Sequence, residues 1–417
     1  MGKTFVEKIL GKKAGKEVVP GEIVMVEPDR LMSHDNSAAI SKKFKSIGIK
    51  NVAYPDRIVI ILDHCVPAAS EKYATNHKVI REFVKEQGIR NFFDIHNGIC
   101  HQVFIEKGFA LPGNLILGSD SHTTSYGAVG AFSAGIGRTE MAALYATGEL
   151  WLKVPQSYKI VVTGKFPAGV SAKDLILHII GTIGSDGALY KSVEFTGETI
   201  SDMSVSDRII LSNMSAEMGA KNGYFAPDDK TREFLKGKTD EGYEEIYPDE
   251  DAEYERILKF DVTNLSPRVA KPHTVDNVSH IEEVKGIKIN QALLGTCTNG
   301  RLNDLEAAAK ILKGKKIHPD TRMLVFPASQ EIMLEAMKNG TLQILAEAGA
   351  VLMNPGCGPC LGAHEGTLAP GEVCITTANR NFKGRMGCKE AFVYLASPET
   401  VAASAIKGEI ADPREVI

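Results

Sequence analysis

Short aliphatic runs that stop abruptly in polar, glycine-containing loops constrain the fold of this chain more than any other feature of its sequence. Within the runs the apolar residues are continuous and do not alternate with polar ones, which is typical of parallel strands covered on both faces. The runs lie at residues 58–62, 92–95, 115–118, 292–295, 350–354 and 373–377. Segments of helical periodicity, such as 303–313 and 329–338, lie between runs. The sequence therefore predicts an α/β fold built on parallel sheets.

The composition excludes several other classes of protein. The 48 basic and 52 acidic residues give a net charge of −4, which offers no electrostatic basis for binding nucleic acid or a membrane surface. The longest wholly aliphatic run, 58–62, is far shorter than the roughly 18 residues that a membrane span requires. No apolar segment of signal-peptide length begins the chain, and seven thinly spread cysteines indicate a reducing compartment. We therefore expect a cytoplasmic protein with no membrane and no nucleic-acid partner.

Two shifts in composition divide the chain. Residues 237–256 are acidic and poor in aliphatic side chains, and a proline-containing linker follows at 265–277. A softer boundary lies near 153–159. A chain of 417 residues has room for two or three domains at about 150 residues each. We predict three domains, at residues 1–155, 156–265 and 266–417.

Chemically capable side chains follow the predicted strands. Asp63 and His64 come directly after the run at 58–62, and Cys297 comes two residues after the run at 292–295. In open α/β sheets the ligand crevice lies beyond the carboxyl ends of the strands. The coincidence of strand ends with acids, histidines and cysteines predicts an enzyme.

Three cysteines are candidate metal ligands. Cys357 and Cys360 form a C-x-x-C on a Gly/Pro turn, and Cys297 is the third candidate. A thioredoxin-like redox pair needs no third cysteine, and no second C-x-x-C or H-x-x-H pair exists to complete a zinc site of four ligands. Three thiolates can instead hold three irons of a [4Fe–4S] cluster and leave the fourth iron open to a substrate oxygen. We interpret the other four cysteines as packed thiols: Cys65, Cys100, Cys374 and Cys388.

Histidines next to acids form a second group of candidates. Six of the eleven histidines lie between His34 and His122, and several of them neighbour an aspartate. A single histidine is usually a core residue, but an imidazole oriented by a carboxylate is what general acid–base catalysis on a hydroxyl requires. Arg380 and Arg385 have the planar donors that bind carboxylates. We regard the histidines without such a setting as structural: His77, His178, His273, His280, His318 and His364.

Together these residues resemble the aconitase superfamily over nearly the whole chain. The motifs DH, GICHQ, SDSHT, GTCTNGRLNDL, NPGCGPCLG and TTANRNFKGR occur in this order. The resemblance implies a three-domain aconitase-like α/β/α core that lacks the swivelling fourth domain of full-length aconitases. It also implies a separate small subunit that supplies this domain, in a heterodimer or heterotetramer.

The resemblance also implies site residues, position by position. The catalytic group is Asp63 with His64, which protonates the departing hydroxyl, His101 paired with Asp120, and His122 paired with Glu217. The family pattern favours His101 over His96 as the histidine that pairs with Asp120. The implied substrate-binding residues are His34, Ser121, Asn213, Asn379, Arg380 and Arg385. The implied ligands of one [4Fe–4S] cluster are Cys297, Cys357 and Cys360.

The implied activity is a hydro-lyase reaction on a small di- or tricarboxylate, in which dehydration and rehydration isomerise the substrate. His34 stands where aconitases carry a glutamine, and this argues for the isopropylmalate branch and against citrate. We expect interconversion of 2- and 3-isopropylmalate in leucine biosynthesis, with homocitrate and homoisocitrate as the alternative. An RNA-binding regulator and a redox iron–sulfur protein are further hypotheses. The first is disfavoured by the acidic balance, and the second predicts a fourth thiolate ligand.

Overall fold

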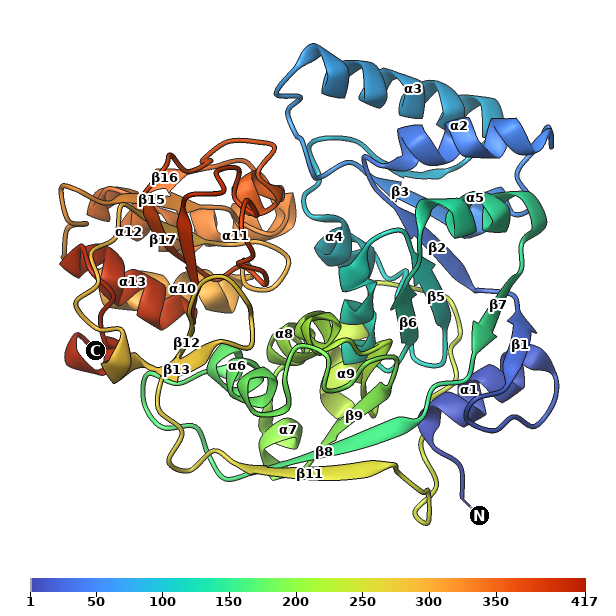
Figure 1. Cartoon of the computed structure of the whole chain (residues 1–417). Helices are drawn as coiled ribbons and strands as arrows, with labels where there is room; N and C mark the ends of the chain where they lie inside the picture. Colours follow the sequence, from blue (N-terminus) through green and yellow to red (C-terminus); the bar gives the residue numbers. More distant parts are fainter. Residues whose placement is uncertain (1) are drawn as a thin grey trace.

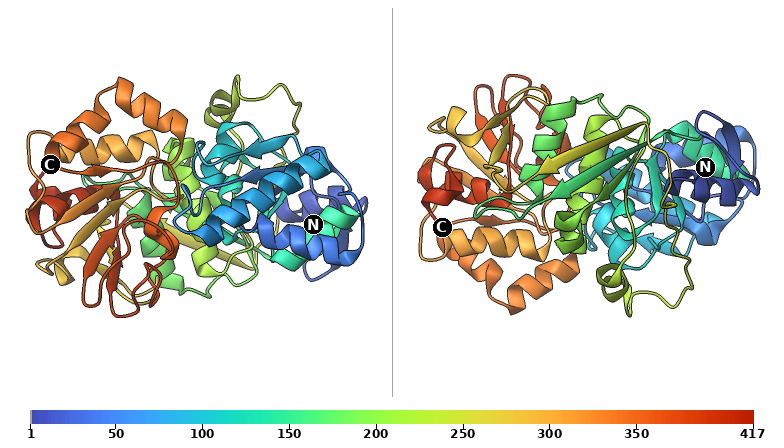
Figure 2. Two further views of the ribbon diagram at one scale, coloured as in Figure 1. Left: turned by 90° about the horizontal axis from the view of Figure 1, so that it is seen from above. Right: turned by 90° about the horizontal axis from the view of Figure 1, so that it is seen from below.

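The computed structural model describes residues 2–417, and it arranges four sheets and their helices into three α/β bodies (Figure 1). The first body lies at the right of Figure 1, the second at the bottom and the third at the left. Seen from above and from below, the second body lies between the other two (Figure 2). The predicted α/β fold with parallel sheets is confirmed.

The first body is built on a five-stranded parallel sheet of order β4-β3-β2-β5-β6. Its strands are β2 (Arg30–Ser33), β3 (Ile58–Ile61), β4 (Asn91–Phe93), β5 (Leu115–Gly118) and β6 (Phe132–Gly135). Its helices are α2 (Ser37–Ile47), α3 (Glu71–Gln87), α4 (Cys100–Glu106) and α5 (Arg138–Thr147), with the 3-10 helices η1 (Pro55–Arg57) and η2 (Ser121–Val129). β3 and β5 are buried along their whole length. The prediction that the runs at 58–62 and 115–118 are strands covered on both faces is therefore confirmed.

The second body is built on a four-stranded parallel sheet of order β10-β9-β8-β11. Its strands are β8 (Ser157–Thr163), β9 (Ser192–Thr196), β10 (Asn222–Phe225) and β11 (Arg256–Asp261). Its helices are α6 (Ala172–Ile183), α7 (Glu198–Asp202), α8 (Val205–Met214), α9 (Asp229–Leu235) and η3 (Ser215–Met218). Capping boxes start α6 at Ser171 and α8 at Ser204, which fixes where both helices begin.

The third body is built on a seven-stranded mixed sheet of order β13-β12-β18-β17-β14-β15-β16. Five strands are parallel, and β12 and β13 join the edge antiparallel. The strands are β12 (Arg268–Ala270), β13 (Val278–His280), β14 (Gln291–Leu294), β15 (Arg322–Val325), β16 (Val351–Leu352), β17 (Val373–Thr376) and β18 (Phe392–Leu395). The helices are α10 (Leu302–Leu312), α11 (Gln330–Lys338), α12 (Thr341–Ala348), α13 (Pro398–Lys407), η4 (Ile281–Glu283), η5 (Gly358–Leu361) and η6 (Pro413–Glu415).

The remaining elements are α1 (Phe5–Ala14) and an antiparallel ribbon of β1 (Ile23–Val26) and β7 (Leu150–Lys153). Residues 238–249, within the predicted acidic segment, form no helix or strand. Ion pairs hold this part of the chain against the first body, among them Lys8 with Asp249 and Arg30 with Glu241. None of the helices within residues 2–417 is both long enough and apolar enough to cross a membrane.

Candidate active site

The carboxyl ends of strands from the first and third bodies face one another across a small cavity of about 70 Å³. Parallel strands bring the loops that follow them to one edge of a sheet, so residues far apart in the sequence meet here. The cavity is lined by Asp63, His64, His101, Asp120, His122, Cys297, Cys357, Cys360, Leu361, Asn379, Arg380 and Arg385. Eleven of these twelve residues are among the fifteen site residues predicted from the sequence.

The other four predicted residues contact the cavity through neighbours. His34 stacks on His64, with ring centroids 3.8 Å apart. Glu217 and Ser121 both accept hydrogen bonds from Arg380, and Asn213 accepts one from Asn379. All fifteen predicted residues therefore belong to one continuous network, although this proximity does not assign their roles.

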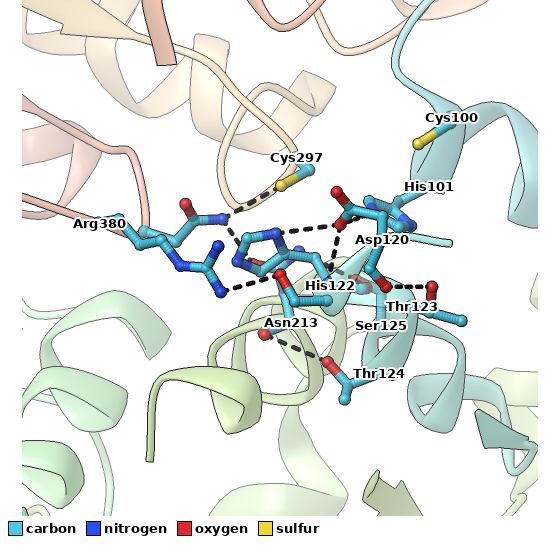
Figure 3. A network of polar contacts seen from close by, with 12 residues as sticks. Cys100, His101, Asp120, His122, Thr123, Thr124, Ser125, Asn213, Cys297 and Arg380 are labelled. Atoms are coloured by element: carbon cyan, nitrogen blue, oxygen red, sulfur yellow. Dashed lines mark hydrogen bonds and ion pairs between the residues drawn. The ribbon is translucent and has the colours of Figure 1, made fainter. Parts of the chain in front are cut away.

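Asp120 is the centre of the histidine cluster (Figure 3). Its Oδ1 atom lies 2.9 Å from Nε2 of His101 and accepts a hydrogen bond from the backbone N–H of His122 at 2.8 Å. Burial alone would raise the pKa of Asp120, but the hydrogen bonds from His101 and His122 outweigh it and hold the pKa well below its usual value. Asp120 is therefore a carboxylate that orients two imidazoles.

His64 is placed to carry a proton. Its Nδ1 atom lies 2.5 Å from Oδ1 of Asp63, and its Nε2 atom lies 3.8 Å from Oδ2 of Asp120. Burial disfavours the charged ring, but Asp63 and then Asp120 and Asp35 raise the pKa of His64 to about 10. The ring is therefore an imidazolium at neutral pH, hydrogen-bonded to a fully buried carboxylate.

His34 has the opposite protonation state. Burial and the neighbouring positive charge of His64 lower its pKa to about 4. Its Nδ1 atom is buried without a hydrogen-bond partner among the described residues. His34 and His64 also line a larger groove of about 780 Å³ next to the cavity. The stacked pair thus combines a neutral ring and a charged ring where the groove meets the cavity.

Glu217 connects the three bodies, because it contacts His122 of the first body and Arg380 of the third. Nε2 of His122 lies 2.8 Å from Oε1 of Glu217, which is on η3 of the second body. Nε of Arg380 donates to both oxygens of Glu217, at 2.9 and 3.1 Å, and another nitrogen of the guanidinium donates to Ser121 Oγ at 2.9 Å. Burial opposes ionisation of Glu217, but His122 and Arg380 keep its pKa below the usual value. The loop after β17 is therefore tied to both other bodies.

Asn213 and Asn379 link this network to Cys297, and Figure 3 shows Asn213 and Cys297 on either side of it. Nδ2 of Asn379 donates to Oδ1 of Asn213 at 3.2 Å and to Sγ of Cys297 at 3.2 Å. Nδ2 of Asn213 donates to Ser125 Oγ at 2.9 Å. The side chains between the histidines and Cys297 are consequently fixed by hydrogen bonds on both sides.

The three predicted cysteine ligands fit a thiolate-bound metal cluster. All seven cysteines are free thiols, and only Cys297, Cys357 and Cys360 line the cavity among the described residues. Asn379 donates to the sulfur of Cys297, and a guanidinium nitrogen of Arg385 lies 3.4 Å from the sulfur of Cys360. Such donors suit thiolates. Burial raises the pKa of Cys297 to about 12 and that of Cys357 well above its usual value, so metal loading must release their protons.

A thioredoxin-like redox pair and a site with a fourth cysteine ligand both fit the structure less well. The C-x-x-C lies on the four-residue 3-10 helix η5, with Cys357 as its N-cap, and the next element is the strand β17 and not an α-helix, which disfavours a thioredoxin-like pair. The remaining cysteines do not line the cavity: Cys65, Cys100, Cys374 and Cys388. Among the described residues no fourth thiol therefore lines the cavity.

Asp35 is a residue of this site that the sequence analysis missed. Its carboxylate accepts hydrogen bonds from the backbone N–H groups of Asp63 at 2.9 Å, His64 at 2.8 Å and Cys65 at 3.3 Å. Nε2 of His77, interpreted as structural from the sequence, lies 2.9 Å from the same carboxylate. Burial opposes ionisation, but the hydrogen bond from His77 and the charge of His64 hold the pKa of Asp35 far below its usual value. The only sequence signal was its place beside His34.

Sequence and structure comparisons relate this chain to known proteins. A model of the aconitase family (aconitate hydratase) matches residues 7–286 and 277–408. The 3-isopropylmalate dehydratase large subunit 1 of Methanopyrus kandleri is 51% identical over 415 residues, which is 99% of each chain. A probable methanogen homoaconitase large subunit of Methanosarcina mazei is 52% identical over 94% of this chain and 100% of its own. The crystal structure of holo-form aconitase X from Thermococcus kodakaraensis, 12% identical, covers 85% of this chain and 84% of its own with a TM-score of 0.51, which supports the fold alone.

Proposed function

The chain belongs to the aconitase family, and from this premise we propose that it is the large, cluster-binding subunit of a 3-isopropylmalate dehydratase. The enzyme is a hydro-lyase that interconverts 2- and 3-isopropylmalate by dehydration and rehydration in leucine biosynthesis. The observation that carries the proposal is full-length similarity to several proteins of this name, at 51% identity in Methanopyrus kandleri and 49% in Halothermothrix orenii. We also propose the domain division 1–155, 156–265 and 266–417 and a cytoplasmic location.

Membership of the family implies an iron–sulfur cluster. We assign it as one [4Fe–4S] cluster held by Cys297, Cys357 and Cys360, because these are the thiols that share the cavity. Three cysteines leave one iron of such a cluster without a protein ligand. When bound, the cluster supplies Lewis-acid chemistry at the hydroxyl that is eliminated.

The acid of the reaction is assigned to His64. Its pKa of about 10 keeps it protonated at neutral pH, and Asp63 fixes which nitrogen faces the cavity. A positioned imidazolium can protonate the departing hydroxyl and later take a proton back from water. His101 and His122, both oriented by Asp120, complete the catalytic group together with Glu217.

The substrate carboxylates are assigned to the wall of the cavity that Arg380 and Arg385 form. Both arginines present planar donors, and Asn379, which also lines the cavity, donates to Cys297. Ser121, Asn213 and His34 complete the substrate-binding group through their contacts with Arg380, Asn379 and His64. Small dicarboxylates are therefore held with their hydroxyl facing His64.

A separate small subunit is implied by the names of the relatives, which are large subunits. We propose that it supplies the base that removes the proton from the carbon next to the hydroxyl, as a heterodimer or heterotetramer with this chain. The chain offers a direct probe of this partner. Trp151, its only tryptophan, is 56% exposed and lines a groove of about 390 Å³ together with Ser121. A partner that reaches Ser121 through this groove will change the ¹⁹F signal of 5-fluorotryptophan at Trp151.

Anaerobic reconstitution with iron and sulfide tests the proposed function. We expect about four irons per chain, an EPR-active three-iron form after brief oxidation, and turnover of 3-isopropylmalate only when the small subunit is added. Full activity of this chain alone would refute the division of the site between two subunits. A cluster that survives oxidation unchanged would indicate a fourth ligand and a redox protein, and a salt-dependent RNA shift with the apo protein would favour the regulator.

Homoaconitase is the second candidate function, because the Methanosarcina mazei relative named for it is 52% identical over its full length. The same holoenzyme should be assayed with homoisocitrate beside 3-isopropylmalate. The larger kcat/KM identifies the physiological class of substrate, since the two candidates share every other expectation.

A further inference from the structure

Lys173, in the first turn of α6, carries a buried amine that the proposed mechanism does not use. Its exposed fraction is 0%, and it forms no ion pair with a carboxylate anywhere in residues 2–417. Its ammonium instead donates two hydrogen bonds, to the backbone carbonyls of Thr377 at 2.7 Å and Ala378 at 2.8 Å. A buried amine costs several kcal/mol unless it is hydrogen-bonded, so these two carbonyls are what makes the burial tolerable.

The two carbonyls belong to the loop that leaves β17 for the active site. In an extended strand successive carbonyls point in opposite directions. Two consecutive carbonyls can share one ammonium only where the chain turns, and here the turn lies immediately before Asn379 and Arg380. The hydroxyl of Thr377 also accepts from the N–H of Gly295 and donates to its carbonyl, both at 2.9 Å. The turn is thereby fixed to the loop of Cys297.

The contact crosses from the second body to the third. Helix α6 packs against β12 and β13 of the third body (Figure 1). Asp174, the next residue, is equally buried, and its Oδ1 accepts from the backbone N–H of Arg268 at 2.8 Å. Asp174 thus anchors α6 to strand β12, whereas Lys173 reaches the substrate loop. An apolar side chain would suffice for packing alone, but it would leave two buried carbonyls without donors.

We propose that Lys173 is a positioning residue for substrate recognition, which holds the 377–378 turn so that Asn379 and Arg380 face the cavity. The proposal deepens the proposed function and rests on it for the identity of the substrate. It predicts that loss of the ammonium releases the substrate loop without removing a group that contacts substrate.

The test compares K173M, K173R and the matched control D174N in the reconstituted two-subunit enzyme. K173M is expected to lower kcat/KM by about 10-fold or more, mainly through KM, because two buried carbonyls lose their donor. K173R, which still donates to two carbonyls, should recover most of that loss. D174N is expected to lower the thermal midpoint with little effect on KM. Equal kinetics of folded K173M and D174N would overturn the proposal.

Hydrogen–deuterium exchange gives a readout that does not depend on the substrate. K173M should speed exchange in the segment 377–385, and D174N should do so in 268–270. If the wild-type enzyme turns over neither isopropylmalate nor homoisocitrate, the proposed function fails, but the exchange pattern still decides the role of Lys173. If K173M does not fold, the exchange of 377–385 and the KM of K173R decide the role of Lys173. An exchange pattern and a KM identical to wild type would refute the proposal, and faster exchange in 377–385 with a raised KM would support it.

Discussion

The carboxylate of Asp35 should control the active site although it does not line the cavity. In D35N the amide oxygen can still accept from the N–H groups of Asp63 and His64, and the amide NH₂ can face His77. What disappears is the negative charge, together with the longer bond from the N–H of Cys65 to Oδ1. Hydrogen bonds to charged groups contribute roughly 1.5–3 kcal/mol and neutral ones roughly 0.5–1.5, so each of the two short backbone bonds should weaken by about 1 kcal/mol.

The loop at 63–65, which carries the proposed acid, should therefore be held in place less strongly by about 2 kcal/mol. We expect kcat of the reconstituted enzyme to fall by roughly 10- to 30-fold in D35N, at 1.4 kcal/mol per tenfold. D35A should be more severe, because it leaves three backbone donors without any acceptor at this position. The assay is steady-state dehydration of 3-isopropylmalate, with iron content and thermal midpoint measured on the same samples.

D94N is the matched control. Asp94 accepts two hydrogen bonds of 2.7 Å from Arg81 in the same body and does not line the cavity. It therefore loses a comparable charge-assisted contact without touching the 63–65 loop. If D35N and D94N have the same kcat per folded, iron-loaded chain, the reasoning that Asp35 orders the site is wrong.

Three further predictions concern stability, substrate binding and metal loading. Burial raises the pKa of Glu194 to about 7 from its ordinary 4.5, so the folded state binds the proton more tightly and stability is lost as the pH rises between these values. The free energy of unfolding of E194Q should therefore exceed that of wild type by up to about 3 kcal/mol at pH 8 and by almost nothing at pH 5. If E194Q and wild type have the same thermal midpoint at both pH values, this reasoning is wrong. R380K should raise KM by about 100-fold, because lysine cannot reproduce the forked contact with Glu217 and Ser121, and a KM within threefold of wild type would count against the assigned wall. C357S should lose iron on reconstitution whereas C388S, outside the cavity, should keep it, and equal iron contents would remove Cys357 from the ligand set.

Local sequence was enough to predict most of the fold and half of the site. The runs at 58–62 and 115–118 become β3 and β5 because apolar segments that are continuous, only four or five residues long and bounded by polar loops are typical of strands covered on both faces. The polar residues after them must then lie at one edge of the sheet, and Cys297 follows β14 for the same reason. Periodicity and strand ends therefore locate the histidine and cysteine loops without any knowledge of contacts.

The remaining site residues depend on contacts that local sequence does not encode. Glu217 follows a helix and not a strand, and only the family resemblance pointed to it. Lys173 lies in the first turn of an amphipathic helix, where a lysine is usually solvated, and its partners are 204 and 205 residues away. Whether such a side chain is buried depends on how two bodies dock, which no pattern of apolar residues specifies.

The charges around His64 explain why the site needs groups from so many loops. A lone imidazole beside a second imidazole at 3.8 Å would share or lose its proton on burial. Here the carboxylates of Asp63, Asp120 and Asp35 together keep the proton on His64, and burial together with that charge lowers the pKa of His34 and keeps it neutral. Two adjacent rings thus differ by about six pKa units, one at about 10 and the other at about 4. Because the three carboxylates follow β2, β3 and β5, the parallel sheet itself produces the separation. A proton donor next to a neutral hydrogen-bonding ring is what a reversible dehydration requires, and it follows from the order of the strands.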